Sequence, residues 1–306
     1  MRIRELPVVA RHTGPHRHQA AVALLFLLPA LLFYAVFIVL PVLFTGVLAL
    51  STGPRPGLTG MTFAGPDNFT ALFAPDSSFL FPVLTNTLLY AAGTVVLTTG
   101  GGLVAALCLV RLPGQGLWRT LYFLPVVTTV VATGNAWKHL YRPDGPVNAA
   151  LNAVGLDSVG FLQNPSAALP AVVVVQSWAS LGSAVLILTA GLTTVPRDCL
   201  EAAALDGAGP LTVLVRVTLP LLRPALLFVC VTQLLAGLQS FALIAVMTGN
   251  GGPGDATDVA ALEMYRRAFT YGDWGTAGAA AFVLFLVTLV ITLAQLRLFE
   301  PGGGDA

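Results

Sequence analysis

Six apolar runs, each long enough to cross a lipid bilayer, constrain the fold of this chain more than any other feature. They cover residues 21–50, 82–110, 117–140, 167–192, 222–247 and 276–296. A helix needs about 20 apolar residues to span the hydrocarbon core. Lipid cannot satisfy backbone groups, so spanning segments form helices or a closed barrel, and these runs lack the alternation of barrel strands. The sequence predicts an all-α membrane protein, a bundle of six transmembrane helices.

The low charge of the chain fits this fold and excludes a water-facing soluble domain. Only 9% of the 306 residues are charged, and 56% are hydrophobic. A soluble domain carries about 25% charged residues. We expect a cytoplasmic tail over residues 1–19, one membrane domain over residues 20–298 and a Gly-rich cytoplasmic tail over residues 299–306. We expect a lipid bilayer around the chain and no nucleic-acid partner.

The positions of Lys and Arg predict the orientation. If the N-terminus is cytoplasmic, the inner side carries twice as many of them as the outer side, in line with the positive-inside rule. The inner residues are Arg2, Arg4, Arg11, Arg17, Arg111, Arg119, Arg197, Arg216, Arg223 and Arg297, and the outer ones are Arg55, Lys138, Arg142, Arg266 and Arg267. Both termini and the loop between the fourth and fifth runs are then cytoplasmic. The first run is longer than the apolar part of a signal peptide, so we expect it to be retained.

The cytoplasmic loop between the fourth and fifth runs contains EAAALDGAGPLTVLVRVTLP, residues 201–220, which we call the signature segment. Its alanines and neighbouring acidic residues predict a short helix that can seat closely in a basic groove. Gly207 allows the chain to turn away, and Pro210 can open a second helical stretch. Pro220 and Pro224 are then expected at the entry to the fifth run. An ordinary hairpin between two spans is the alternative interpretation.

The signature segment resembles the EAA signature of inner-membrane permease subunits in binding-protein-dependent ABC importers. That signature reads EAA, three residues, G, nine residues, I, one residue, LP, and Val217 stands where Ile is usual. The matching residues are Glu201, Ala202, Ala203, Gly207, Leu219 and Pro220. In that family the segment couples the membrane subunit to an ATPase on another chain. The resemblance implies this coupling role for the six residues and for Asp206.

The resemblance covers roughly residues 86–297 and is to carbohydrate-uptake permeases of the maltose and glycerol-phosphate type. It rests on the stretches LTNTLLY, RTLYFLPVV, GPVNAALNAVGL, AGLTTVPRDCLEAA and MTGNGGPGDAT. It implies the six-helix type I permease bundle in a bacterial inner membrane, forming half of the path for a sugar or related polyol. It implies as partners a second homologous permease or another copy of this chain, two cytoplasmic ABC ATPase subunits, and an extracytoplasmic solute-binding protein.

The chain has no phosphate-binding loop of its own. A GxxxxGK[ST] loop needs a Lys before Ser or Thr, and the only Lys is Lys138, in AWKHL. We expect a non-catalytic subunit that binds no cofactor or metal, with ATP and Mg²⁺ on the separate ATPase chain. The alternatives are a permease for a noncarbohydrate solute, a scaffold that recruits a cytoplasmic partner, and an ion-coupled carrier. Such carriers usually place ionisable residues at mid-depth, where these runs carry none.

Uncharged polar residues in the fourth and fifth runs predict the solute path. Gln176 and Ser180 are four residues apart and share a helix face, while Gln233, Gly237 and Ser240 repeat at i, i+4 and i+7. Amides and hydroxyls both donate and accept hydrogen bonds, which suits the hydroxyls of a sugar. Bonding and close packing between helices is the alternative role for these residues.

Overall fold

The computed structural model describes residues 17–53, 60–110, 112–249 and 251–299. The expected tails therefore lie largely outside the described residues. The chain divides into two units, Met1–Val47 and Leu48–Ala306. Within the described residues, five helices are long and apolar enough to cross a membrane: Val22–Ala49, Phe81–Leu109, Pro165–Thr193, Pro210–Leu238 and Trp274–Arg297.

The described residues of the first unit form one continuous helical stretch, which ends at Ala49, two residues into the second unit. Helix α1 (Arg17–Tyr34) continues through a π-helical turn, Ala35–Val39, into α2 (Leu40–Ala49). A proline ring clashes with the carbonyl four residues before it. The carbonyl that Pro41 would meet is that of Phe37, which lies inside the wider π turn. The π turn therefore lets the helix continue past this proline.

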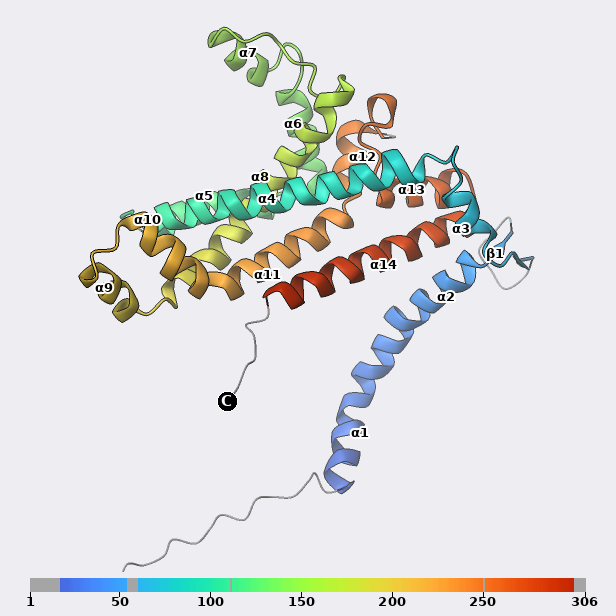
Figure 1. The fold of residues 1–306 in the computed structure, drawn as a ribbon. Helices are drawn as coiled ribbons and strands as arrows, with labels where there is room; N and C mark the ends of the chain where they lie inside the picture. Colours follow the sequence, from blue (N-terminus) through green and yellow to red (C-terminus); the bar gives the residue numbers. More distant parts are fainter. Residues whose placement is uncertain (1–16, 54–59, 111, 250, 300–306) are drawn as a thin grey trace, which may run out of the picture. The chain divides into compact units, whose positions relative to one another are not determined.

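Four long helices form the framework of the second unit (Figure 1). They are α4 (Thr85–Leu109), which follows a π turn at Phe79–Leu84, α8 (Pro165–Thr193), α11 (Leu219–Leu238) and α14 (Trp274–Phe299). Helix α4 packs against α8 and α11, and α11 packs against α14. At Gly102 in α4, an added Cβ would lie 2.8 Å from the Cβ of Ala184 in α8, so the two helices approach closely there.

The third apolar run, expected as one helix over residues 117–140, forms two. Helix α5 (Gln115–Val127) and α6 (Val130–Leu140) are separated by Thr128 and Thr129, which have extended backbone with ψ of 137° and 146°. Pro125 weakens the end of α5 by removing a backbone donor. The Thr129 hydroxyl then accepts the N–H of Ala132 at 3.3 Å and begins a new helix.

The fifth run also differs from the expected single helix over residues 222–247. The helix begins earlier, with α10 (Pro210–Val213) and a π turn at Leu214–Thr218, and α11 ends at Leu238 before a short α12 (Ala242–Thr248). Pro220 lies in the first turn of α11, as expected at the entry to the fifth run, whereas Pro224 lies inside α11 and the helical stretch already begins at Pro210. The Pro220 ring would meet the carbonyl of Arg216, which lies in the π turn. The arrangement is the same as at Pro41, where the carbonyl of Phe37 lies in a π turn.

Short elements close the ends of the second unit. They are the antiparallel pair β1 (Ser51–Thr52) and β2 (Thr62–Phe63), α3 (Asp67–Leu72), α7 (Pro146–Ala153), α9 (Arg197–Leu205), the 3₁₀ turn Pro253–Asp255, and α13 (Ala260–Tyr265) with the π turn Arg266–Thr270.

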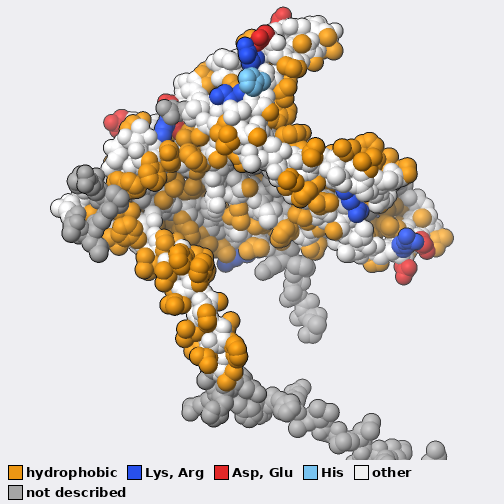
Figure 2. All heavy atoms as spheres, turned by 180° about the vertical axis from the view of Figure 1, so that it is seen from behind, with side chains coloured by type: hydrophobic (Ala, Val, Ile, Leu, Met, Phe, Trp, Pro, Cys, Tyr) orange, Lys and Arg blue, Asp and Glu red, His pale blue; other side chains and the backbone are white. Residues whose placement is uncertain are grey.

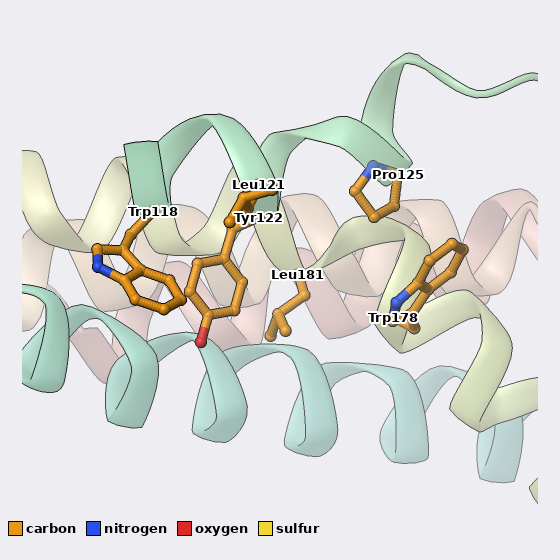
Figure 3. A pocket seen from close by; sticks show the side chains of 6 residues that line it. All are labelled: Trp118, Leu121, Tyr122, Pro125, Trp178 and Leu181. Carbon is orange, nitrogen blue, oxygen red and sulfur yellow. The ribbon is translucent and has the colours of Figure 1, made fainter. Parts of the chain in front are cut away.

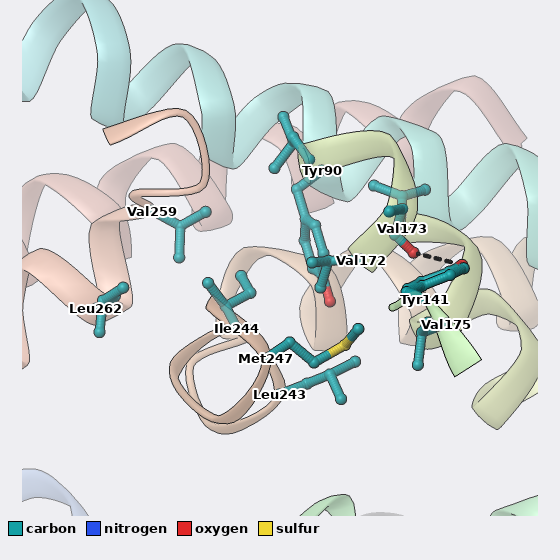
Figure 4. Packing of buried hydrophobic residues seen from close by; sticks show 12 residues of the cluster. Tyr90, Tyr141, Val172, Val173, Val175, Leu243, Ile244, Met247, Val259 and Leu262 are labelled. Atoms are coloured by element: carbon teal, nitrogen blue, oxygen red, sulfur yellow. Dashed lines mark hydrogen bonds between the residues drawn. The ribbon is translucent and has the colours of Figure 1, made fainter. Parts of the chain in front are cut away.

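The core and surface of the second unit suit a lipid environment. One buried cluster joins α4, α8 and α12 through Tyr90, Val172 and Ile244 (Figure 4). The space-filling view shows broad hydrophobic areas and few charged side chains on the visible face (Figure 2). Exposed apolar side chains such as Val104 and Val290 belong to the long helices. Such a surface is more stable in contact with hydrocarbon than with water.

Candidate functional site

The signature segment forms an exposed helical hairpin. Glu201 and Ala202 are exposed on α9, and Ala203 is partly buried. After the C-cap residue Asp206, the N–H of Gly207 donates to the carbonyl of Ala204 at 3.1 Å, and that of Ala208 donates to the carbonyl of Ala203 at 3.0 Å. This pair of bonds is a Schellman motif, which requires a left-handed residue. Gly207 supplies it, with φ of +75°.

The second half of the signature segment belongs to the long helix. Gly209 caps α10, as expected for Pro210 at the first position of a helix. Leu219 is partly buried and Pro220 is exposed, both on the helix that continues into α11. Leu205, at the tip of the hairpin, is 89% exposed. The seven residues expected to couple the chain to an ATPase therefore fall into two groups, five on α9 and its C-terminal turn and two, Leu219 and Pro220, at the start of α11.

An apolar cavity of about 730 Å³ separates this hairpin from the neighbouring helix ends. It is lined by α4, α8 and the hairpin itself, through residues that include Leu107, Leu192, Leu200, Leu211 and Leu214. Leu200 of α9 thus faces this cavity, while Glu201 and Ala202 on the same helix are exposed.

A second, more polar cavity of about 230 Å³ lies where the third apolar run is interrupted. Its lining includes Thr128 and Thr133 from the break between α5 and α6, and Gln176, Ser180 and Ser183 from α8. Two of the residues predicted for the solute path, Gln176 and Ser180, therefore line a cavity with hydrogen-bonding capacity.

A chain of hydrogen bonds connects this cavity to α4 and to the end of α11. The Ser240 hydroxyl donates to the Tyr90 oxygen at 3.1 Å, and the Tyr90 hydroxyl donates to Oε1 of Gln176 at 3.4 Å. Nε2 of Gln176 donates to the Ser180 hydroxyl oxygen at 3.0 Å. Sequence reasoning missed Tyr90, although a tyrosine inside an apolar run signals a hydroxyl that needs a partner. Three predicted path residues thus share one polar network.

Gln233 and Gly237 occupy a different environment from the other predicted path residues. A Cβ at Gly237 would lie 2.8 Å from the Cα of Ala91 and 2.9 Å from the hydroxyl of Thr94, so α4 and α11 touch there. Gln233 is only 8% exposed and lies one helical turn before Gly237 on the same face. Neither residue lines the polar cavity. This placement favours the helix-packing role for Gly237.

Buried charges fix the loop that follows α12. The Arg266 guanidinium pairs with Asp258 and with Glu263, the latter at 2.7 Å, and Arg267 pairs with Glu263 at 2.6 Å. Burial raises the pKa of the Asp258 carboxyl to about 7, against the opposing effect of Arg266. The Asn86 amide donates to the carbonyl of Asp258 at 3.1 Å and so ties the loop to α4.

The described residues offer no group of three or more His, Cys, Asp or Glu side chains that could hold a metal ion. Their three cysteines, Cys108, Cys199 and Cys230, are free thiols.

Comparison with known proteins places the chain among transport subunits. Residues 115–302 match the family model described as "Binding-protein-dependent transport system inner membrane component". The chain is 33% identical over 276 residues to the probable ABC transporter permease protein YesP of Bacillus subtilis, which covers 89% of this chain and 88% of that protein. It is 30% identical over 281 residues to the trehalose/maltose transport system permease protein MalF of Thermococcus litoralis, with 91% and 94% covered.

The fold is also shared with a solved structure. A chain of a bacterial alginate ABC transporter, in complex with an alginate pentasaccharide-bound periplasmic protein, superimposes with a TM-score of 0.77 at 22% identity. The match covers 92% of this chain and 95% of that one.

Proposed function

This chain belongs to the family of binding-protein-dependent transport system inner membrane components, and on that premise we propose that it forms half of an ATP-driven importer's path for a sugar or related polyol. A second homologous permease, or another copy of the chain, supplies the other half. A solute-binding protein delivers the solute outside, and two separate ATPase subunits bind ATP and Mg²⁺ inside. The membrane is that of a bacterial cell, and both termini are cytoplasmic.

The observation that carries the solute class is the uncharged polar network at the broken third run. Gln176 and Ser180 line the polar cavity, and Gln176 donates a hydrogen bond to Ser180. Tyr90 donates to Gln176 and accepts a hydrogen bond from Ser240. Hydroxyl-rich solutes need donors and acceptors rather than ion pairs, and amides and hydroxyls provide both. A relative described as a trehalose/maltose permease supports the same class.

The hairpin supports the coupling role. Its α9 helix is exposed, carries Asp198 and Glu201, and is followed by the C-cap residue Asp206 and the Gly207 turn. A small-residue helix with acidic groups suits a basic groove on a partner ATPase. The continuous helix from Pro210 to Leu238 then joins this hairpin to the part of the chain that bears the solute path.

The test is reconstitution of the complete importer, with both permeases, the ATPase subunits and the binding protein, in proteoliposomes. We expect uptake of radiolabelled sugar to require ATP hydrolysis and to survive collapse of the proton gradient by an ionophore. Uptake driven by an ion gradient with this chain alone would contradict the proposal. Uptake of amino acids or peptides, but of no sugar or polyol, would contradict the solute class.

A further inference from the structure

A third cavity, of about 250 Å³, adjoins the polar one, and three of its six lining residues are aromatic (Figure 3). It lies between α5 and α8, and its walls are Trp118, Leu121, Tyr122, Pro125, Trp178 and Leu181. Pro125 lines both cavities, so the two lie next to each other. Figure 3 shows Tyr122 and Leu181 between the two tryptophans.

The tryptophans of this cavity are more exposed than packing requires. Trp118 is 42% and Trp178 is 41% exposed, although both belong to helices that pack against each other. Trp178 lies near the midpoint of α8, whereas membrane tryptophans that face lipid gather at the two interfaces. A half-exposed indole at mid-depth is therefore better explained by a cavity ligand than by lipid.

The cavity wall is held by direct contact between helix backbones. A Cβ at Gly182 would overlap the carbonyl oxygen of Tyr122, so α5 and α8 touch one turn after Trp178. The ring of Trp178 also meets that of Trp137 edge-to-face, with centroids 5.5 Å apart. These contacts fix Tyr122 and Trp178 as the walls of a preformed site, as most small-molecule pockets are.

We propose that this cavity is a stacking subsite for one ring of the transported sugar. The C–H face of a pyranose is apolar and lies well against indole and phenol rings, while its hydroxyls point outward. A neighbouring sugar ring would occupy the polar cavity, where Gln176 and Ser180 bond its hydroxyls. The solute then contains at least two sugar units. This inference rests on the proposed function.

The experiment uses the complete importer in proteoliposomes with external binding protein. Uptake of maltose, trehalose, lactose and glucose is measured together with ATP consumption for the unaltered complex and for Trp178→Leu, Trp178→Phe and Trp118→Leu. Phe228→Leu is the matched control, because Phe228 is 57% exposed on α11 and lines neither cavity. Quenching of Trp178 emission by dibrominated phospholipid, taken as the difference from Trp178→Phe, detects a lipid occupant.

We expect the unaltered complex to take up at least one of the three disaccharides. Both leucine variants should carry at least tenfold less of it per ATP hydrolysed, while Trp178→Phe and the control stay within about twofold. Normal uptake by both leucine variants, an equal loss of uptake and ATP hydrolysis, or strong quenching by brominated lipid would overturn the stacking subsite alone. Uptake of glucose and of no disaccharide would overturn the two-ring assignment. Uptake of none of these four sugars would overturn the subsite, and uptake of no sugar or polyol at all would refute the proposed function as well.

Discussion

Replacing Gly207 with alanine should impair coupling through the backbone, because the side chain itself meets no obstacle. Nothing lies within 4 Å of a Cβ added at Gly207, but its φ is +75°. A left-handed conformation costs an L-residue other than Gly or Asn roughly 1–2 kcal/mol. That cost lowers the population of the hairpin in its native turn by about 5–30-fold relative to alternatives, since 1.4 kcal/mol corresponds to a factor of about 10. The larger Gly207→Leu should act in the same way before any crowding by a partner.

Gly209→Ala is the matched control, two residues away in the same hairpin. Gly209 has φ of −68° and ψ of 162°, which any residue adopts, and it too has open space around it. The assay compares sugar uptake and binding-protein-stimulated ATP hydrolysis in proteoliposomes, with hydrogen exchange along α9 as a readout of the turn. We expect Gly207→Ala to lower uptake several-fold and to speed exchange in α9, Gly207→Asn to retain most activity, and Gly209→Ala to resemble the unaltered chain. Equal uptake by the two alanine variants would refute the reasoning.

Three further variants test other parts of the structure. Tyr90→Phe should lower uptake with little effect on assembly. The variant leaves Ser240 and Gln176 without their shared hydrogen-bond partner, which costs about 1–3 kcal/mol. Unchanged uptake across sugar concentrations would contradict this. Gly237→Val should destabilise the detergent-solubilised chain by about 1–3 kcal/mol, since its Cβ has no room against α4, and an unchanged thermal midpoint would show otherwise. The Asp258 carboxyl, with a folded pKa raised from 3.8 to about 7, binds its proton more tightly in the folded state. Its contribution to stability is therefore complete below pH 3.8 and is lost as the pH rises through 7. The thermal midpoint of the unaltered chain should fall relative to that of Asp258→Asn as the pH rises through 7. Parallel pH profiles of the two proteins would contradict this.

Sequence reasoning located the long helices because their signal is simple. An apolar stretch of about 20 residues has few options in lipid, so four of the six expected runs appear as single helices close to their predicted bounds. The prediction of the third run as one helix was wrong, because hydropathy does not report backbone hydrogen bonding. The break at Thr128 and Thr129 depends on a proline before it and a capping hydroxyl after it. Both residues are uncharged, so the hydropathy of an apolar run does not reveal the break.

The sequence predicted individual residues of the candidate site, but not which of them lie together in the fold. Helical spacing put Gln176 and Ser180 on one face, and the structure brings them to one cavity. The same spacing also grouped Gln233 with Gly237, yet that face is pressed against α4. Periodicity shows which residues share a face, but it does not show what the face meets. Only the packing of α4 between α8 and α11 distinguishes the two cases.

The hairpin and the polar network are joined by a single stretch of helix. From Pro210 to Leu238 the chain is helical for 29 residues, interrupted only by the π turn at Leu214–Thr218. At about 1.5 Å per residue, this stretch reaches roughly 43 Å from the hairpin toward Ser240, whose hydroxyl bonds to Tyr90. A displacement of the hairpin by the proposed ATPase partner would therefore act on a stiff element, whose other end is connected through Ser240 and Tyr90 to Gln176 in the wall of the polar cavity. The π turn that accommodates Pro220 departs from regular α-helical hydrogen bonding, so we expect the helix to bend there.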